Sequence, residues 1–373
     1  MNIKMIKIML VALMALPASS VEAQERPITL AEAMSEARRG SHDVRAARAR
    51  AEAARHAERA AGSYRMPTLG LEVGGVRSND PVAAFGGRLR QGRFTEQDFD
   101  PNRLNQPDAL TDWSGAIAAG WAPLDLTAAS ALSAAEAEAD AAGLGAEWAE
   151  RAASFRAEAR YLDAVGAERR LRAADAALAA AAEVTRLVGL RTGEGLLTEA
   201  DLMQSRAALE AARAARIDAQ RALDDARDRL AVALGWPEGM LPVPTDTVFT
   251  VQAQAGEADL TARPDLRASA QLLGAASARV AQARRARLPR VEGFARLETH
   301  SAELLSGAQR DWTVGVQVRV PLFTGFAMTA RTQAASAIHH AAEQEHEGRL
   351  RAAAAELGEA RRAVEAARQA RQA

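Results

Sequence analysis

The chain has 373 residues, of which 25% are charged, and its formal net charge is −1. This balance argues against nucleic acid or an anionic membrane surface as the main partner. Aromatic residues make up only 4%, and the sequence contains no cysteine. The composition therefore favours long, closely packed helices over a thick globular core, and it excludes disulfides and cysteine-based metal sites.

The first 23 residues have the pattern of a signal peptide. Lys4 and Lys7 precede the apolar run 8–16, and Ala23 completes a small-x-small cleavage pattern. The apolar run is shorter than the ~20 residues that a permanent span requires, although an uncleaved anchor stays an alternative. Since no other segment is apolar enough for a transmembrane helix, we expect an exported protein that is periplasmic, released or an outer-membrane barrel.

The first helix is expected directly after this segment. Thr29 and Glu32 have the spacing of a capping box, in which each side chain satisfies a backbone N–H of the first turn. We expect the helix to run from Thr29 to about residue 61, because Gly62 and Pro67 follow.

Two segments then alternate apolar and polar side chains, which is the period of a strand. The first covers residues 66–77, and the second covers residues 112–122, where Trp113 and Trp121 lie on the same face. Residues 78–110 between them are rich in Gly, Asn, Asp, Pro and Arg, which predicts a long polar loop.

A long helical hairpin is predicted over residues 128–235. The outgoing helix has apolar side chains at helical spacing, and the returning helix ends at Gly235. Leucines 202, 209, 223 and 230 keep a seven-residue register, with Arg216 in the remaining position. This repeat predicts coiled-coil packing of the two helices, with the tip of the hairpin at residues 191–202.

The second part of the chain repeats the first. Residues 43–46 match residues 265–268 at an offset of 222 positions, and Met66-Pro67 matches Leu288-Pro289 at the same offset. We therefore expect a first repeat over 24–250 and a second, incomplete repeat over 251–373. The second repeat is predicted to contain strands at 290–298 and 311–320 and an outgoing helix at 325–373.

Four alternating strands cannot bury an apolar face by themselves, and a membrane accepts strands only as a closed barrel. Several copies of the chain are therefore expected to share one barrel. Trp113 and Trp121 are separated by ~26 Å at ~3.3 Å per residue, close to the ~25 Å apolar band of outer-membrane barrels. Together with Trp312 they are candidate membrane-interface aromatics, with ordinary packing as the alternative.

This order of elements resembles the TolC family of outer-membrane efflux proteins. The local motifs that resemble the family are TLAEA at 29–33, RTGEGLLTEADL at 191–202, RPDL at 263–266 and PLFTG at 321–325. The resemblance implies a mainly α protein with membrane β-strands, in which three copies share a twelve-strand barrel in the outer membrane. Long coiled-coil hairpins then extend into the periplasm as a helical tunnel.

The family resemblance also implies the function. Such a homotrimer is the passive exit duct of a tripartite efflux system, and it docks on a periplasmic adaptor and an inner-membrane pump. The pump selects the small molecules or metal ions that leave. No enzyme activity and no cofactor are expected. A non-functional fragment, a periplasmic adaptor and a coiled-coil structural protein are the alternatives.

The tip of the hairpin contains the residues that the resemblance implies are functional. Gly195, Leu196, Leu197 and Thr198 match the turn that meets the adaptor, and Asp201 matches the acidic residue that helps to close the tunnel. A capping role is the alternative for Asp201, because Thr198 and Asp201 also fit the start of a helix.

His339, Glu343 and His346 are spaced i, i+4, i+7 on the predicted last helix. The pattern suits a metal ion but lacks a third strong ligand, and His340 is expected to point elsewhere. We interpret these residues as a solvated helix face and assign no metal site.

The second hairpin is incomplete in this sequence. After Pro321 only 52 residues remain, and the chain ends at Ala373 before a second tip turn. We therefore expect a C-terminally truncated family member, either a fragment or a shortened duct. We also expect that this chain alone does not form a stable open duct.

Overall fold

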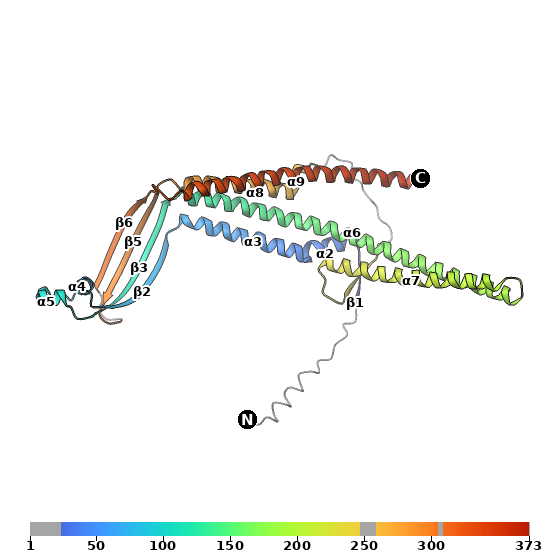
Figure 1. The fold of residues 1–373 in the computed structure, drawn as a ribbon, viewed down its shortest axis with the longest axis horizontal. Helices are drawn as coiled ribbons and strands as arrows, with labels where there is room; N and C mark the ends of the chain where they lie inside the picture. Colours follow the sequence, from blue (N-terminus) through green and yellow to red (C-terminus); the bar gives the residue numbers. More distant parts are fainter. Residues whose placement is uncertain (1–23, 247–258, 305–308, 373) are drawn as a thin grey trace, which may run out of the picture. The chain divides into compact units, whose positions relative to one another are not determined.

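The computed structural model describes residues 24–246, 259–304 and 309–372 (Figure 1). The expected signal peptide lies outside these residues. The chain divides into two compact units. Unit 1 comprises residues 1–49 and 146–258, and unit 2 comprises residues 50–145 and 259–373. None of the described helices has an apolar stretch long enough to cross a membrane.

The first helical region contains two helices where the sequence predicted one. Helix α2 spans Leu30–Gly40, and the capping box of Thr29 and Glu32 is present as expected. Helix α3 spans His42–Gly62. The break falls at Ser41, which has extended backbone angles (φ −61°, ψ 143°) and whose hydroxyl accepts a hydrogen bond from the N–H of Val44. Ser41 therefore acts as the N-cap of α3, because a serine side chain at this position replaces a missing backbone partner.

A short parallel strand pair in unit 1 was not predicted. Strand β1 spans Gln24–Ile28 and pairs with β4, which spans Met240–Pro244. The buried hydroxyl of Tyr161 accepts hydrogen bonds from the N–H groups of Thr245 and Asp246, both at 3.1 Å. The same hydroxyl lies 3.1 Å from the carbonyl oxygen of Ile28. Tyr161 thus connects the C-terminal ends of the two parallel strands to its own helix, and its burial raises the pKa of the phenol.

The helical hairpin is formed by α6, Leu126–Gly193, and α7, Glu199–Leu234. The predicted heptad is confirmed along α7, where Leu223 and Leu230 are buried and the earlier positions are half-buried. Arg216 fills its position by forming an ion pair across the hairpin, with Nε 3.0 Å from Oδ1 of Asp175. The helix ends at Gly235, whose φ of 72° is left-handed and suits a residue without a side chain. The intervening heptad positions are small, which brings the two helices close together: Ser205, Ala212, Ala219, Ala226 and Ala233.

Unit 2 contains a four-stranded antiparallel sheet in the order β2-β3-β5-β6. All four strands lie where the sequence predicted them, with somewhat different ends. Short 3-10 turns lie at Ser63–Arg65 and Leu260–Ala262. The strands span Thr68–Ser78, Leu110–Leu124, Arg290–Ser301 and Gln309–Arg319.

The β2–β3 segment, residues 79–109, is a small helical structure, so the expectation of a polar loop was wrong. It contains α4 (Pro81–Arg90), a 3-10 turn (Glu96–Phe99) and α5 (Pro101–Asn105). Asp80 caps α4 and Pro81 begins it, which is a helix start signal inside a polar stretch. The segment has its own apolar contacts, with edge-to-face ring pairs Phe85–Phe94 at 4.9 Å and Phe94–Phe99 at 5.1 Å.

Helices α8 (Pro264–Arg285) and α9 (Ala327–Gln372) pack antiparallel in unit 2. Contacts that join them are Arg263 Nη1 to Glu356 Oε2 at 3.0 Å and Ser269 Oγ to His346 Nδ1 at 2.7 Å. The division into two repeats, 24–250 and 251–373, stays a prediction. The matching segments 43–46 and 265–268 open α3 and α8, and the matching Met66-Pro67 and Leu288-Pro289 directly precede β2 and β5.

Candidate functional site

One face of the sheet is apolar and open to its surroundings. Leu71, Ile117, Leu297 and Trp312 are register partners across all four strands, so their side chains form one row on the same face. Their exposed fractions are 74%, 52%, 47% and 76%. Large apolar side chains left this accessible indicate a surface that contacts something other than water.

The opposite face is polar. The next row of register partners is Glu72, Ala116, Glu298 and Asp311. Arg296, on the same face, holds Glu72 at 2.8 Å and also forms an ion pair with Glu298. Because side chains alternate between faces along a strand, the sheet has one face suited to lipid and one suited to water.

The three candidate interface tryptophans lie on the apolar face. Trp113 packs over Gly75, where a Cβ atom would stand 2.6 Å from the indole ring. Trp121 donates from Nε1 to the carbonyl oxygen of Arg65 at 3.1 Å. Trp312 is in register with Ile117, midway between the other two along the strand direction. Their role at a membrane interface stays a prediction.

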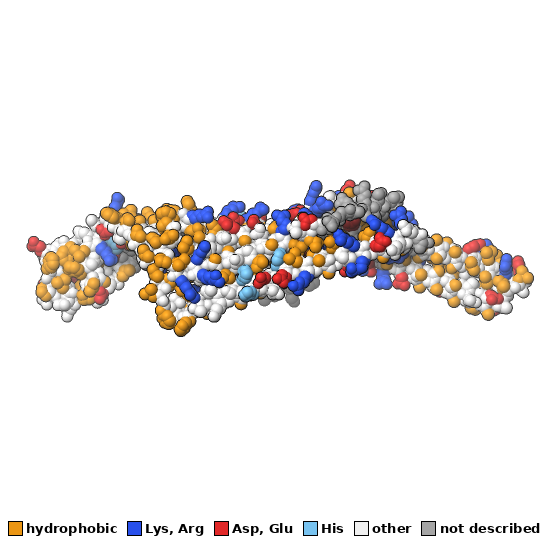
Figure 2. Space-filling model, turned by 90° about the horizontal axis from the view of Figure 1, so that it is seen from above, with side chains coloured by type: hydrophobic (Ala, Val, Ile, Leu, Met, Phe, Trp, Pro, Cys, Tyr) orange, Lys and Arg blue, Asp and Glu red, His pale blue; other side chains and the backbone are white. Residues whose placement is uncertain are grey.

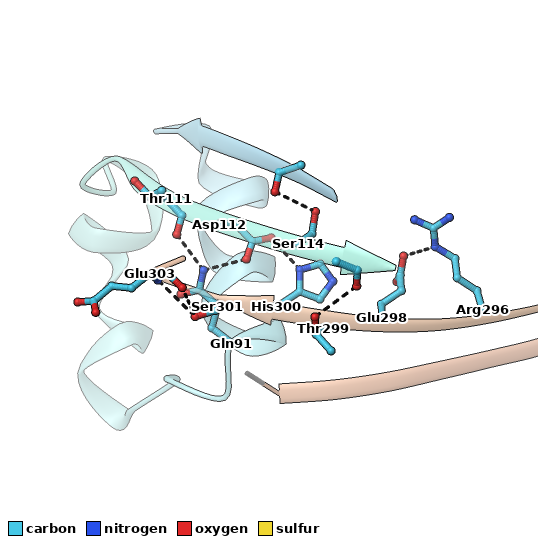
Figure 3. Close-up of polar contacts among 12 residues, drawn as sticks. Gln91, Thr111, Asp112, Ser114, Arg296, Glu298, Thr299, His300, Ser301 and Glu303 are labelled. Atoms are coloured by element: carbon cyan, nitrogen blue, oxygen red, sulfur yellow. Dashed lines mark hydrogen bonds and ion pairs between the residues drawn. The ribbon is translucent and has the colours of Figure 1, made fainter. Parts of the chain in front are cut away.

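The β2–β3 segment is joined to the polar face by a buried network (Figure 3). Nδ1 of His300 lies 2.8 Å from Oδ2 of Asp112, and Nε2 of Gln91 donates to Oδ1 of Asp112 at 2.9 Å. Gln91 also donates to the carbonyl oxygen of Thr111 at 2.9 Å. Gln91 and His300 are only 7% and 5% exposed. The segment therefore covers the polar face at the end where β3 begins.

This network was not predicted from the sequence. Gln91 lies in the stretch expected to be a loop, and His300 follows the predicted strand 290–298, so the three side chains had no common element. The one signal in the sequence was the alternation of polar residues along β5, which continues past residue 298 to His300. Oε1 of Gln91 and Nε2 of His300 have no hydrogen-bond partner among the described residues.

The tip of the hairpin has the geometry of a tight turn followed by a capped helix. Gly195 adopts a left-handed φ of 77° and leads into Leu196, which is 69% exposed, while Leu197 is half-buried. The hydroxyl and backbone N–H of Thr198 donate to Asp201, at 2.6 Å and 2.9 Å, and lower the pKa of that carboxyl. The capping interpretation of Asp201 is thus confirmed, and its role as a gate stays a prediction.

Apolar side chains outside the α6–α7 seam are exposed near the tip. Figure 2 shows hydrophobic side chains among charged ones over this end of the hairpin. These apolar side chains lie outside the contact between α6 and α7, so they are available to another chain. They are Val184, Leu187, Leu190, Leu196 and Met203, which are 45–69% exposed.

The histidines of α9 are arranged differently from the sequence expectation. Nδ1 of His346 lies 2.7 Å from Oγ of Ser269 on α8, so this imidazole does not lie beside His339 and Glu343. His340 was expected to point elsewhere, but its Nδ1 lies 3.4 Å from Oε2 of Glu343. A residue at i+3 along a helix is a neighbour on the same surface, which explains the contact.

A family model and a curated relative both match this chain. The outer membrane efflux protein family matches residues 33–236 and 257–373 of this chain. Protein CyaE of Bordetella pertussis is 30% identical over 291 residues, which cover 74% of this chain and 59% of that protein. This chain thus spans about 59% of the length of the curated relative it matches.

Solved structures share the fold. A membrane protein of Pseudomonas aeruginosa matches with a TM-score of 0.73 and 24% identity, over 86% of this chain and 73% of that one. The CmeC outer membrane channel of Campylobacter jejuni matches with a TM-score of 0.72 and 19% identity, over 86% and 67%. The MtrE outer membrane channel of Neisseria gonorrhoeae gives a TM-score of 0.67 at 20% identity, over 86% and 69%. With its two-faced sheet and its long helical hairpin, the chain belongs to the outer membrane efflux protein family, the TolC family.

Proposed function

We propose that this chain is a subunit of the outer-membrane exit duct of a tripartite efflux system. The duct is a passive conduit for small molecules or metal ions that an inner-membrane pump and a periplasmic adaptor deliver. The observation that carries the proposal is the sheet, which has one exposed apolar face, one charged face and two free edges, at β2 and β6. Family membership supports the same function.

The free edges support assembly into a homotrimer. Each edge strand leaves a row of backbone N–H and C=O groups without strand partners, and such groups cannot remain unpaired in lipid. Pairing β6 of one copy with β2 of the next closes a barrel, and three four-stranded sheets give twelve strands. The apolar face then contacts lipid, and the face with Glu72, Arg296 and Glu298 lines a water-filled interior.

The remaining roles follow from this assembly. The tip residues Gly195, Leu196, Leu197 and Thr198 dock on the adaptor, and Asp201 contributes to a constriction of the tunnel. Trp113 and Trp121 contact the two membrane interfaces, and Trp312, which lies midway between them along the strand direction, contacts lipid within the apolar band. The two repeats, 24–250 and 251–373, supply corresponding strands and helices. Nothing in this mechanism forms or breaks a bond, so the chain acts without enzyme chemistry.

Disulfide cross-linking between copies tests the proposal, because the chain has no cysteine of its own. Leu71→Cys on β2 combined with Val314→Cys on β6 places two thiols on the apolar faces of opposite edge strands. Neighbouring pairs, with Leu69 or Val73 and Trp312 or Val316 as the replaced residues, cover other registers. In the outer-membrane fraction, at least one pair should give cross-linked dimers and trimers after mild oxidation.

The matched control replaces Thr313 in place of Val314, because Thr313 lies on the polar face of the same strand. A thiol there points into the barrel and should not meet one at position 71. Protein that stays monomeric for every pair, and that fractionates with the soluble periplasm, would contradict the proposed duct.

A further inference from the structure

Three metal-ligating side chains meet on one turn of α9. One donor atom from each of His339, His340 and Glu343 lies within 4.8 Å of the other two. His340 Nδ1 is 3.4 Å from Glu343 Oε2, and the two imidazole rings are 5.9 Å apart between centroids. Among the residues that the structure describes, no other group of three such side chains has this spacing.

The cluster borders a hollow between α8 and α9. His339 and His340 line this hollow together with Ser277 and Arg284 from α8. His339 and Glu343 are half-buried, and His340 is exposed. Solvent therefore reaches the donor atoms, and the His340 side chain is the most accessible of the three.

Two imidazoles and one carboxylate form a donor set that prefers transition-metal ions to Mg²⁺ and Ca²⁺. Imidazole nitrogen suits Zn²⁺, Cu²⁺ and Ni²⁺, whereas Mg²⁺ and Ca²⁺ prefer oxygen ligands alone. Three protein ligands with a fourth position open to water are typical of zinc sites that exchange ligands, not of closed structural sites. We propose that His339, His340 and Glu343 form a binding site for a divalent transition-metal ion, with Zn²⁺ as the representative ion.

Nearby groups define the strength of the site. Arg284 lines the same hollow, and its positive charge opposes a cation, so binding is expected to be readily reversible. Arg285 also lines the hollow, but its Nη1 donates to Ser130 Oγ at 2.9 Å. Ser269 holds His346 at 2.7 Å, which leaves that imidazole outside the cluster. The inference does not depend on the proposed duct, because all three ligands come from one helix of unit 2.

Calorimetric titration of the purified chain with Zn²⁺ tests the site, using an affinity tag that contains no histidine. The parent chain should bind one ion at pH 7.5 and should not bind Mg²⁺. Loss of hydrogen-bond partners around metal ligands lowers affinity by about 10–100-fold, so His339→Ala, His340→Ala or Glu343→Gln should each weaken binding at least as much. Lower pH should weaken binding in the parent, because protons compete for the ligands.

Two histidine variants are matched controls. His56 lies 3.8 Å (Nε2) from Oε1 of Glu52 and belongs to no group of three metal-ligating side chains among the described residues, so His56→Ala should leave the titration unchanged. His346→Ala removes an imidazole from the same helix without touching the cluster and should also have no effect. Helix content measured by circular dichroism verifies that each variant is folded. The proposal is overturned if all three ligand variants bind Zn²⁺ as the parent does, or if the parent does not bind it.

Discussion

Nδ1 of His300 lies 2.8 Å from Oδ2 of Asp112, and both side chains are on the polar face of the sheet. Gln91, from the β2–β3 segment, donates to the other oxygen of the same carboxylate at 2.9 Å. A carboxylate that accepts from two neighbours at once holds both in place, and charge-assisted hydrogen bonds are stronger than neutral ones. Asp112 is therefore one of the residues through which the helical segment is attached to the strands, together with the carbonyl oxygen of Thr111.

Replacing either donor should loosen this attachment. Asp112 is half-buried, and a hydrogen bond to a charged group contributes about 1.5–3 kcal/mol, so His300→Ala and Gln91→Ala should both increase opening of α4. Hydrogen exchange of the amides in residues 81–90 measures the effect. His56→Ala, at an exposed histidine of α3, is the control and should change nothing. Unchanged protection of α4 in both variants would show that the network does not hold the segment.

The start of α7 should depend on pH and on the Thr198 side chain. Removing a threonine N-cap typically costs about 1 kcal/mol, so Thr198→Ala should increase exchange of the first-turn amides of α7. Thr192→Ala at the end of α6, whose hydroxyl donates to the carbonyl oxygen of Val188 within the same helix, is the comparison and should have a smaller effect.

The pH dependence of this turn follows from Asp201. The Thr198 hydroxyl and its backbone N–H lower the pKa of the Asp201 carboxyl in the folded state. The unfolded state therefore binds the proton more readily, so the stabilisation is present above pH of about 4 and is lost as the pH falls further. Protection factors at the tip, followed downward from pH 6, should decrease in the parent and stay flatter in Asp201→Asn. Equal pH dependence in the two proteins would contradict the capping role.

The coiled-coil seam should respond strongly to truncation of its leucines. Leu230 is fully buried, and leucine-to-alanine changes at such positions destabilise proteins by about 2–5 kcal/mol. Ile217 lies next to the seam but is 64% exposed, so Ile217→Ala should change the free energy of unfolding by less than about 0.5 kcal/mol. Denaturant unfolding followed by helix content compares the two. Arg216 is assigned to the heptad position, and Ile217 is placed outside it. If Leu230→Ala and Ile217→Ala lower the free energy of unfolding by similar amounts, that assignment is wrong.

Tyr161→Phe should show how much the hydrogen bonds of the hydroxyl contribute to stability, because the packing of the ring is kept. The change keeps the ring but leaves the N–H groups of Thr245 and Asp246 without the oxygen that accepts from them, which should cost about 1–3 kcal/mol. Since burial raises the pKa of Tyr161, the unfolded state loses its proton first as the pH rises. The parent should lose stability above pH of about 10, and Tyr161→Phe should lose less over the same interval. A steeper alkaline loss in the variant would contradict this account.

Periodicity was sufficient to predict the main elements. All four strands of the sheet and both helices of the hairpin lie where alternation or helical spacing placed them, because each buries or exposes a continuous apolar stripe. The Thr29 capping box was visible for a similar local reason, since both partners lie within one turn, and a helix start at Thr198 and Asp201 was visible as an alternative interpretation of the tip. The break at Ser41 was not visible, because a serine that caps a helix looks like any polar residue inside one.

Elements that depend on distant contacts could not be predicted from local patterns. Strands β1 and β4 are short and contain proline, and they exist only because segments more than 200 residues apart pair with each other. The β2–β3 segment has the composition of a loop, yet three phenylalanines pack within it. The Gln91, Asp112 and His300 network combines three segments, so neither its members nor its burial could be inferred from spacing.

Cysteine accessibility along β6 tests the two-faced sheet in the membrane most directly. Single cysteines at Asp311, Thr313 and Gln317 lie on the polar face, and those at Trp312, Val314, Val316 and Val318 lie on the apolar face. In outer-membrane vesicles, a water-soluble maleimide should label the first group readily and the second group poorly, with a period of two residues. Uniform labelling along the strand, or faster labelling of the apolar face, would contradict the claim that this sheet forms the wall of a membrane duct.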